Sequence, residues 1–269
     1  MSPTRHPFDG RAAGRPNLDH RHDDELAFWN KVGTGRLQRA RDYRIPDLSD
    51  HVRLFGKFEY LRPVIEFWGD IRGATVLDLG CGNGWLTLSM AKSGAIATGV
   101  DISPALTEFA TRLAQENGLA HLATFTSMPA EALTFADESY DFVIMHAALH
   151  HCDIEKAGRE AHRVLKRGGR AVFIEDYAYH PLLKLYRALS KSAHTRFERP
   201  LTDDDVAALV SRFSSHELRY YGLLNMFHAS RIGPVRRCLP LLSWADDVVM
   251  GAMPWTRRYA KLVAIWVTK

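Results

Sequence analysis

The chain has 269 residues, of which 46% are hydrophobic and 25% charged, a composition typical of a globular protein with one large core. No stretch reaches the run of about 18 apolar residues that a membrane-spanning helix needs, and residues 1–17 lack the apolar segment of a signal peptide. Cys81, Cys152 and Cys238 are far apart and do not have the spacing of a metal site. We therefore predict a cytoplasmic protein with reduced thiols and no bound metal.

Charge is distributed unevenly along the chain. The formal net charge is +4, but residues 1–72 carry +2, residues 73–176 carry −5 and residues 177–269 carry +7. The basic C-terminal third could attract an anionic substrate, a membrane surface or a nucleic acid. A solvated basic face is the simpler interpretation.

The N-terminal part is predicted to hold a tail and two helices. Residues 1–22 are rich in Pro, Gly, His and Arg, which predicts a mobile tail. Helical patterning begins near Asp23, and a second helix is predicted over residues 54–67, where Phe55 and Phe58 recur with other apolar residues at helical intervals.

From residue 74 to residue 176 the chain alternates between short apolar runs and amphipathic segments. These patterns predict strands over residues 75–79, 96–101, 121–126, 140–146 and 170–175, and helices over residues 85–93, 104–117 and 155–165, followed by a turn over 166–169. Alternating units of this size indicate a parallel sheet with helices on both faces.

After residue 176 the pattern changes. Helices are predicted over residues 182–192 and 203–213, the second with Thr202 as N-cap and Asp205 in the capping-box position. Residues 222–255 are apolar but interrupted by Gly and Pro. Strands predicted over residues 216–221 and 259–268 would add an antiparallel edge to the parallel sheet.

The fold class is therefore predicted as α/β, with a Rossmann-like sheet of seven mostly parallel strands and helices on both of its faces. The predicted units are a tail (1–22), N-terminal helices (23–70), a nucleoside-binding core (71–180), a helical cap with the sixth strand (181–255) and the final strand (256–269).

A glycine-rich turn follows the first predicted strand, in the sequence VLDLGCGNG over residues 76–84. Gly80, Gly82 and Gly84 would let the backbone turn sharply and approach a ligand closely, beside the unpaired N–H groups that begin the next helix. Asp101 ends the following strand, where a carboxylate can accept both hydroxyls of an adenosine ribose.

Asp78 distinguishes between two nucleoside cofactors. A dinucleotide site uses a G-x-G-x-x-G turn that receives a pyrophosphate, whereas this turn reads G-C-G-N-G and directly follows Asp78. A negative charge there disfavours a pyrophosphate and favours the α-amino group of a methionine. The sequence thus predicts S-adenosylmethionine as cofactor, and an NAD-dependent oxidoreductase becomes the alternative.

The segment from Val76 to Asp176 resembles the class I S-adenosylmethionine-dependent methyltransferases, especially their type 11 group. The resemblance is carried by VLDLGCGNG, GVDIS (99–103), PAEALTF (129–135), SYDFVIMHAALHH (139–151) and RVLKRGGRAVFIED (163–176). It implies that the glycine turn binds the methionine part, Asp101 the ribose, and the segments at Ile102 and at 130–131 the adenine. The predicted cofactor-binding residues are Asp78, Gly80, Cys81, Gly82, Asn83, Gly84, Asp101, Ile102, Ala130, Glu131 and His146.

One position departs from the family pattern. The family usually has an Asp before the Ala-Glu pair, hydrogen-bonded to the adenine amine, whereas this chain has Pro129. Ser127 or a backbone carbonyl would have to replace that contact.

His146, His151 and Glu175 are the candidate catalytic residues. Because a sulfonium methyl is already activated, the protein mainly aligns the acceptor, and a base is needed only where the acceptor must lose a proton. Histidine suits that task. His146 and Glu175 end strands at the carboxyl edge of the sheet, and His150 and His151 begin the next loop. The alternatives are that His146 lines the cofactor and that the paired histidines make structural hydrogen bonds.

The acceptor must be selected outside the core. In the family, helices placed like residues 23–70 commonly form a lid. Residues 181–255 are the second candidate, with Arg196 and Arg199 among bulky apolar residues. This pattern suits a lipophilic or aromatic acceptor with negative charge, and also shallow contact with an anionic membrane surface. A packed helical cap with surface arginines is the simpler interpretation.

The leading hypothesis is methyl transfer to an oxygen, carbon or nitrogen of a small molecule. A nucleic-acid methyltransferase is less favoured, since residues 146–149 read HAAL where base-amino methyltransferases have Asn/Asp-Pro-Pro-aromatic, and no nucleic-acid-binding module is recognisable. A protein that binds the cofactor without catalysing a reaction is a further alternative.

Overall fold

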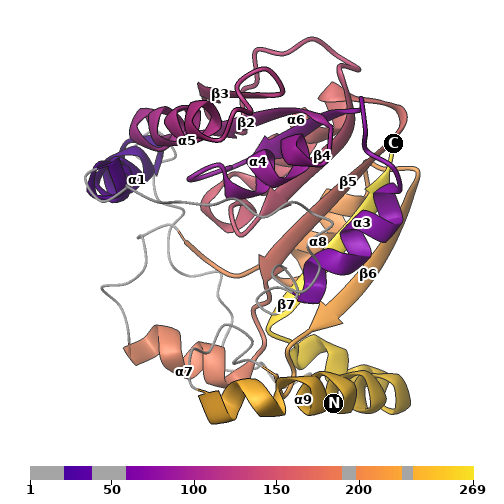
Figure 1. Ribbon diagram of the computed structural model, residues 1–269. Coiled ribbons are helices and arrows are strands. Elements are labelled where there is room, and N and C mark those ends of the chain that lie inside the picture. The colour runs from indigo at the N-terminus through magenta and orange to yellow at the C-terminus, as the bar shows by residue number, and fades with distance from the viewer. Residues whose placement is uncertain (1–20, 38–58, 190–197, 226–232) are drawn as a thin grey trace.

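The structure is a computed structural model that describes residues 21–37, 59–189, 198–225 and 233–269 (Figure 1). Its strands are β1 (Thr75–Leu79), β2 (Ile96–Asp101), β3 (Ala123–Ser127), β4 (Tyr140–His146), β5 (Leu165–Asp176), β6 (Ser215–Tyr221) and β7 (Leu262–Thr268). Its helices are α1 (Arg21–Leu37), α3 (Arg62–Trp68), α4 (Trp85–Lys92), α5 (Pro104–Glu116), α6 (Ile154–Val164), α7 (Pro181–Leu189), α8 (Asp203–Val210) and α9 (Gly233–Ala252), with 3-10 helices η2 (Glu59–Leu61), η3 (Leu149–His151) and η5 (Pro254–Tyr259).

The seven strands form one sheet in the order β3-β2-β1-β4-β5-β7-β6, which confirms the predicted fold class. The chain runs outward from β1 to β3 and then returns to β4, so β1 and β4 flank the point where open α/β sheets bind ligands. β7 lies between β5 and β6 and is antiparallel to both. Of these seven strands, β7 alone runs antiparallel to the others. The sequence predicted an antiparallel edge made by both late strands, whereas β6 is parallel to the rest.

Helices cover both faces of the sheet, because its central strands are apolar on both sides. Val143 and Ile144 are successive residues of β4 that point to opposite faces, and both are buried. One face packs against α3, α4 and α5, and the other against α6 and α8. The cores contain Trp68, Leu88, Leu113 and Trp266 on the first face, and Leu77, Ala161, Phe173 and Leu209 on the second.

Two elements differ from their predicted forms. β5 begins at Leu165, so the turn predicted over residues 166–169 is part of the strand. The strand is irregular there, with Gly168 at φ +72° and a shift in register opposite Tyr140 and Phe142. α9 runs through Pro240 in the segment predicted to be broken. A proline removes one helical hydrogen bond, and α9 is fixed to the rest of the chain because Asp246 accepts the backbone N–H groups of residues 223–225.

The N-terminal helices are only partly within the described residues. α1 begins at Arg21, and most of the predicted tail lies outside the description. The predicted second helix appears as η2 and α3, while Phe55 and Phe58 lie outside. α1 packs closely on α5, since a Cβ at Gly33 would come 2.9 Å from the Ala105 Cβ. The three cysteines are free thiols, as predicted.

Candidate active site

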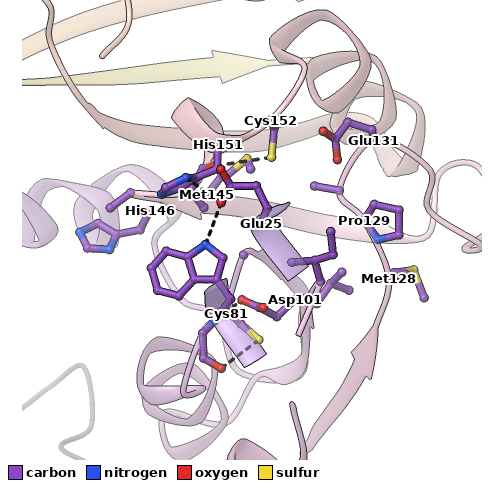
Figure 2. A pocket seen from close by; sticks show the side chains of 18 of the residues that line it. Glu25, Cys81, Asp101, Met128, Pro129, Glu131, Met145, His146, His151 and Cys152 are labelled. Carbon is purple, nitrogen blue, oxygen red and sulfur yellow. Dashed lines mark hydrogen bonds and ion pairs between the residues drawn. The ribbon is translucent and has the colours of Figure 1, made fainter. Parts of the chain in front are cut away.

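A cleft of about 240 Å³ lies at the carboxyl ends of β1, β2 and β4, at the point where the strand order reverses (Figure 2). It is enclosed by the glycine turn, the 128–131 loop, the turn after β4 and one face of α1. Most of the predicted cofactor residues line it, namely Gly80, Cys81, Gly82, Asn83, Asp101, Ile102, Ala130, Glu131 and His146. Asp78 and Gly84 do not.

The glycine turn needs glycine for its conformation and for space. Gly80, Gly82 and Gly84 have φ of +70°, +55° and +75°, a region that side chains rarely adopt. A Cβ at Gly80 would stand 2.3 Å from the Cβ of Ala148, so the turn passes directly against the backbone that follows β4. Two segments that bound the cleft are thereby held in contact.

Asp101 is held rigidly at the wall of the cleft. One carboxylate oxygen accepts the Gly82 N–H at 2.9 Å, and the other accepts the Ser103 N–H at 2.9 Å. This side chain therefore links the glycine turn to the start of α5. The arrangement fits a carboxylate that receives further donors from the cleft side.

Asp78 was expected to bind the methionine part of the cofactor, but it does not face the cleft. It lies behind the turn, 2% exposed, and its carboxylate accepts the Thr87 hydroxyl at 2.6 Å. Burial raises its pKa to about 7. Because it does not line the cleft, Asp78 can act on a bound amino group only through its electric field. Gly84 also lies behind the turn, against Ala110 and Phe125.

The end of the cleft assigned to adenine is mostly apolar, with Ile102, Met128, Pro129 and Ala130 in its wall. The Ser127 hydroxyl donates to the Ile102 carbonyl at 3.1 Å, and Ser127 is not part of the lining. The expected replacement of the family carboxylate by Ser127 is therefore not supported by its position.

Glu131 connects three segments. Its Oε1 accepts from the Arg21 guanidinium at 3.1 Å and from the Asp153 backbone N–H at 3.0 Å. His22 Nε2 lies 3.4 Å from the same oxygen. Glu131 thus ties the start of α1 to the start of α6, a contact that no sequence pattern predicted.

His146 faces the cleft from the end of β4 and is also bound on its other side. Its Nε2 lies 3.0 Å from the Tyr60 hydroxyl, and the two rings are stacked with centroids 5.6 Å apart. Burial lowers the pKa of His146 to about 4, so the ring is neutral near pH 7.

His151 lines the same cleft and pairs with a carboxylate from α1. Its Nδ1 lies 3.1 Å from Glu25 Oε2, which also accepts the Trp29 indole N–H at 3.1 Å (Figure 2). Glu25 and Trp29 also line the cleft. Sequence reasoning missed Glu25, whose only signal was the spacing of four residues that places it on the same face of α1 as Trp29.

Glu175 is fully buried and lies outside the lining. Its Oε1 accepts the backbone N–H groups of Ala148 and Leu149 at 2.9 and 2.7 Å, and its Oε2 lies 2.5 Å from His150 Nδ1. Burial disfavours the His150 imidazolium, yet the nearby carboxylates outweigh it and raise the pKa of His150. Glu175 therefore fixes the turn after β4, and its position does not support direct contact with an acceptor.

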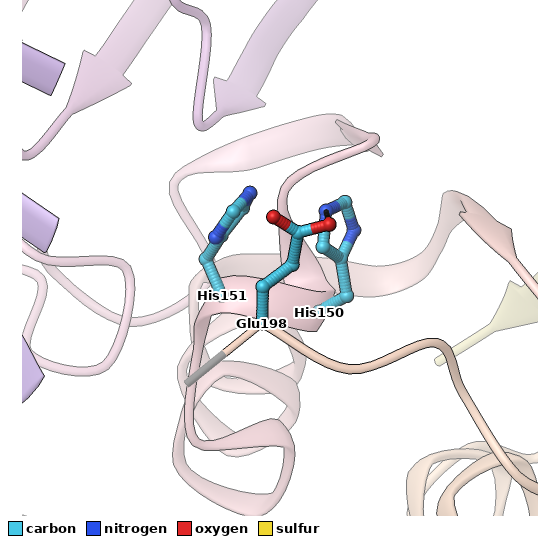
Figure 3. A group of neighbouring side chains, drawn as sticks. All are labelled: His150, His151 and Glu198. Atoms are coloured by element: carbon cyan, nitrogen blue, oxygen red, sulfur yellow. Dashed lines mark ion pairs between the residues drawn. The ribbon is translucent and has the colours of Figure 1, made fainter. Parts of the chain in front are cut away.

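His150, His151 and Glu198 form a cluster next to this turn (Figure 3). One potential ligand atom from each lies within 4.8 Å of the other two, so their chemistry and spacing would suit a metal ion. Ion pairs already engage the cluster, since His150 pairs with Glu175 and Glu198 lies 2.9 Å from the Arg187 guanidinium. That the protein binds no metal therefore stays a prediction.

Of the two arginines singled out in the sequence, Arg199 lies within the described residues. Arg196 lies outside the described residues. Arg199 pairs with Asp205 of the α8 capping box and is not part of the lining. The predicted capping box is confirmed, with Thr202 accepting the Asp205 N–H.

The chain is similar in sequence to known methyltransferases. The family model described as a methyltransferase domain matches residues 77–173. The uncharacterized methyltransferase YcgJ of Bacillus subtilis is 32% identical over 151 residues, covering 54% of this chain and 57% of the relative. The demethylmenaquinone methyltransferase of Tropheryma whipplei is 31% identical over 173 residues, covering 61% and 70%. The chain spans 43% of a Bartonella tribocorum ubiquinone/menaquinone C-methyltransferase, so it covers about half the length of several curated relatives.

Solved structures share the fold. Geranyl diphosphate C-methyltransferase of Streptomyces coelicolor, in complex with S-adenosyl-L-homocysteine, gives a TM-score of 0.59 at 16% identity, covering 96% of this chain and 99% of that one. Magnesium protoporphyrin IX methyltransferase of Synechocystis, also with bound SAH, gives 0.58 at 17% identity, covering 93% and 99%. Identities this low extend the similarity to the fold alone.

Proposed function

The chain belongs to the class I S-adenosylmethionine-dependent methyltransferases, and we propose that it transfers a methyl group from S-adenosylmethionine to a small-molecule acceptor. The observation that carries the proposal is the shared cleft. The glycine turn, Asp101 and the His151–Glu25 pair come from distant parts of the sequence and line one cavity at the switch point of the sheet.

The residues of the cleft fit the cofactor at each end. The glycine turn would hold the methionine part, and Asp101 would accept the ribose hydroxyls while its backbone donors keep it in place. Ile102, Met128 and Pro129 would pack against the adenine ring, so that shape replaces the carboxylate contact of the family. When bound there, the cofactor supplies a methyl group already activated by the sulfonium.

His151 is our candidate for the residue that takes a proton from the acceptor. With Nδ1–H donated to Glu25, the neutral ring presents Nε2 as its proton-accepting nitrogen, and the Glu25 carboxylate would stabilise the imidazolium that forms. His146 is a poorer base because burial lowers its pKa to about 4, which favours a lining role.

The acceptor is proposed to be lipophilic or aromatic. The names of the relatives include quinone-biosynthesis C-methyltransferases, and those of the structural neighbours include geranyl diphosphate and magnesium protoporphyrin IX methyltransferases. Trp29, Trp85 and Met145 provide apolar surface in the cleft of this chain. We propose that α1 acts as the lid over that cleft and residues 181–255 as the cap that selects the acceptor.

Two measurements on the purified chain test this function. Calorimetry should show that the chain binds S-adenosylmethionine but not NAD. Asp101→Asn should weaken the affinity for S-adenosylmethionine by about tenfold to a hundredfold, the range for a lost charge-assisted hydrogen bond. Asp70→Asn, in an exposed carboxylate, serves as the control. A labelled methyl group should then enter a small molecule of a cell extract. Preferential binding of NAD would refute the proposal, as would labelling of nucleic acid alone or tight cofactor binding without any labelled product.

A further inference from the structure

α7 and α9 lie at one end of the molecule, beyond the carboxyl ends of β5 and β6 (Figure 1). Both helices expose apolar side chains. On α7, Leu182, Leu185 and Leu189 are 50%, 55% and 78% exposed. On α9, Leu241, Trp244 and Val248 are 64%, 62% and 48% exposed. In both helices the spacing is i, i+3 and i+7, so each set forms one stripe along the helix.

These stripes belong to a concentrated apolar surface. Among the described residues, every exposed large hydrophobic side chain except Ile96 lies between Leu182 and Trp255. We call the part on α7, α9 and η5 the cap face; its members are Leu182, Leu185, Tyr186, Leu189, Leu241, Trp244, Val248, Met253 and Trp255. Apolar residues gathered in this way mark an interaction surface, whereas scattered ones do not.

Cations adjoin the cap face. Lys184 of α7 and Arg258 of η5 are exposed, and both lie over the ring of Tyr179, at 5.6 and 4.8 Å from its centroid. The two elements therefore meet at this tyrosine. Arg257 is exposed beside them, and Asp247 is the exposed acid in the described part of α9. The cap face thus combines apolar stripes, tryptophans and a positive rim.

We propose that the cap face docks the protein on an anionic lipid membrane, with α7 and α9 lying in the plane of the interface. Amphipathic helices bind there through buried apolar side chains and basic residues that meet lipid phosphates. Tryptophan and tyrosine suit the headgroup level, because their rings are apolar and their N–H and O–H groups are polar. Among the described residues, no helix has the length and apolar character needed to cross a bilayer.

The cations favour a membrane over a second copy of the chain as the occupant. A two-fold interface places the same surface on both partners. Pairing two cap faces would set two surfaces against each other that each carry Lys184, Arg257 and Arg258, with Asp247 of α9 and Asp203, whose N–H donates to the Tyr179 hydroxyl, as the fewer nearby exposed acids. Anionic lipid instead supplies the opposite charge.

Vesicle binding by the full-length chain tests the proposal without any acceptor. We expect the chain to co-sediment with vesicles of phosphatidylcholine mixed with phosphatidylglycerol, and less with phosphatidylcholine alone. The double variant Leu185→Ser/Trp244→Ser should lower the partition coefficient by about tenfold or more, because two apolar anchors are removed. Ile96→Ser removes an equally exposed apolar side chain outside the cap face and should bind like the parent.

Binding of S-adenosylmethionine by each variant reports whether the cleft is intact, so loss of vesicle binding cannot be ascribed to unfolding. The proposal is overturned if the parent does not bind anionic vesicles, or if Ile96→Ser weakens binding as much as the double variant. It is also overturned if the parent is a dimer in solution that the double variant dissociates. None of these results bears on methyl transfer, which is measured separately.

Discussion

His146 and His151 lie in one cleft but in opposite chemical settings. His146 is stacked on Tyr60 and bonded to its hydroxyl, and burial keeps its pKa near 4. His151 has a carboxylate at Nδ1, the arrangement that orients a histidine base. We therefore propose a proton-accepting role for His151 and a lining role for His146.

His151→Gln is expected to lower kcat by about a hundredfold to ten-thousandfold on an acceptor that must lose a proton, while cofactor affinity changes little. Glu25→Gln should have a smaller effect in the same direction, because it removes only the orienting charge. His121→Gln, at an exposed histidine, is the control. A kcat in His151→Gln equal to that of the parent would assign the proton to another group.

Asp78 links the stability of the fold to pH. Its pKa rises from 3.8 to about 7 on folding because of burial. Between these values the unfolded chain has lost a proton that the folded chain keeps. The contribution of Asp78 to stability is thus complete below pH 3.8 and declines as the pH rises to about 7.

Asp78→Asn stays neutral and can still accept the Thr87 hydroxyl. We expect its Tm to match that of the parent at about pH 4 and to exceed it at about pH 8, where the parent buries a charge. Other titrating groups cancel in this comparison of two nearly identical chains. The same variant should bind S-adenosylmethionine more weakly, since the negative field behind the glycine turn is lost. A Tm difference that shrinks towards high pH would contradict the assignment.

The residues that could be predicted from the sequence are those with a local signature. Three glycines after an apolar strand and an acid at the end of the next strand identify the cofactor side of the cleft without knowledge of the fold. Glu25 and Tyr60 have no such signature, because they meet His151 and His146 across separations of 126 and 86 residues. Only tertiary packing brings them together.

At the scale of elements, the parallel strands were the easiest to predict, since strands buried on both faces are continuous apolar runs. β1, β2 and β4 match their predicted residues. α9 was not predicted as one helix, because Pro240 and Gly251 are breakers by local propensity and the helix is held by packing and by Asp246. The early start of β5 was obscured by Gly168 and Gly169, which resemble a turn.

The glycine turn provides a matched pair of substitutions. Gly80 and Gly118 both have φ +70°, but a Cβ at Gly80 would lie 2.3 Å from the Ala148 Cβ, whereas a Cβ at Gly118 would have no neighbour within 4 Å. Gly118→Ala should cost about 1–2 kcal/mol from backbone strain alone. Gly80→Ala should cost a further amount of about 1–3 kcal/mol from overpacking and should also abolish cofactor binding. Urea unfolding measures both. Equal losses would mean that the turn adapts and that its contact with Ala148 is loose.

At the scale of the whole molecule, opposite charges are segregated along the chain. Residues 73–176, which hold most of the cleft lining, carry −5, and residues 177–269, which hold the cap face, carry +7. A molecule divided in this way approaches an anionic surface with its cap first. The cleft and the cap face both lie towards the carboxyl ends of the parallel strands.

This charge division predicts how membrane binding depends on salt. Exposed charges are screened over about 10 Å at 0.1 M salt and about 3 Å at 1 M, while burial of apolar stripes is not weakened by salt. Binding to anionic vesicles should therefore fall as sodium chloride is raised, towards the weaker affinity seen for neutral vesicles. Lys184→Gln/Arg258→Gln should reduce this salt dependence and leave binding to neutral vesicles unchanged, because both cations are exposed beside the apolar stripes. Measuring partition against salt for parent and variant separates the two forces. A salt dependence that is the same in both chains would place the electrostatic contact elsewhere on the basic third of the chain.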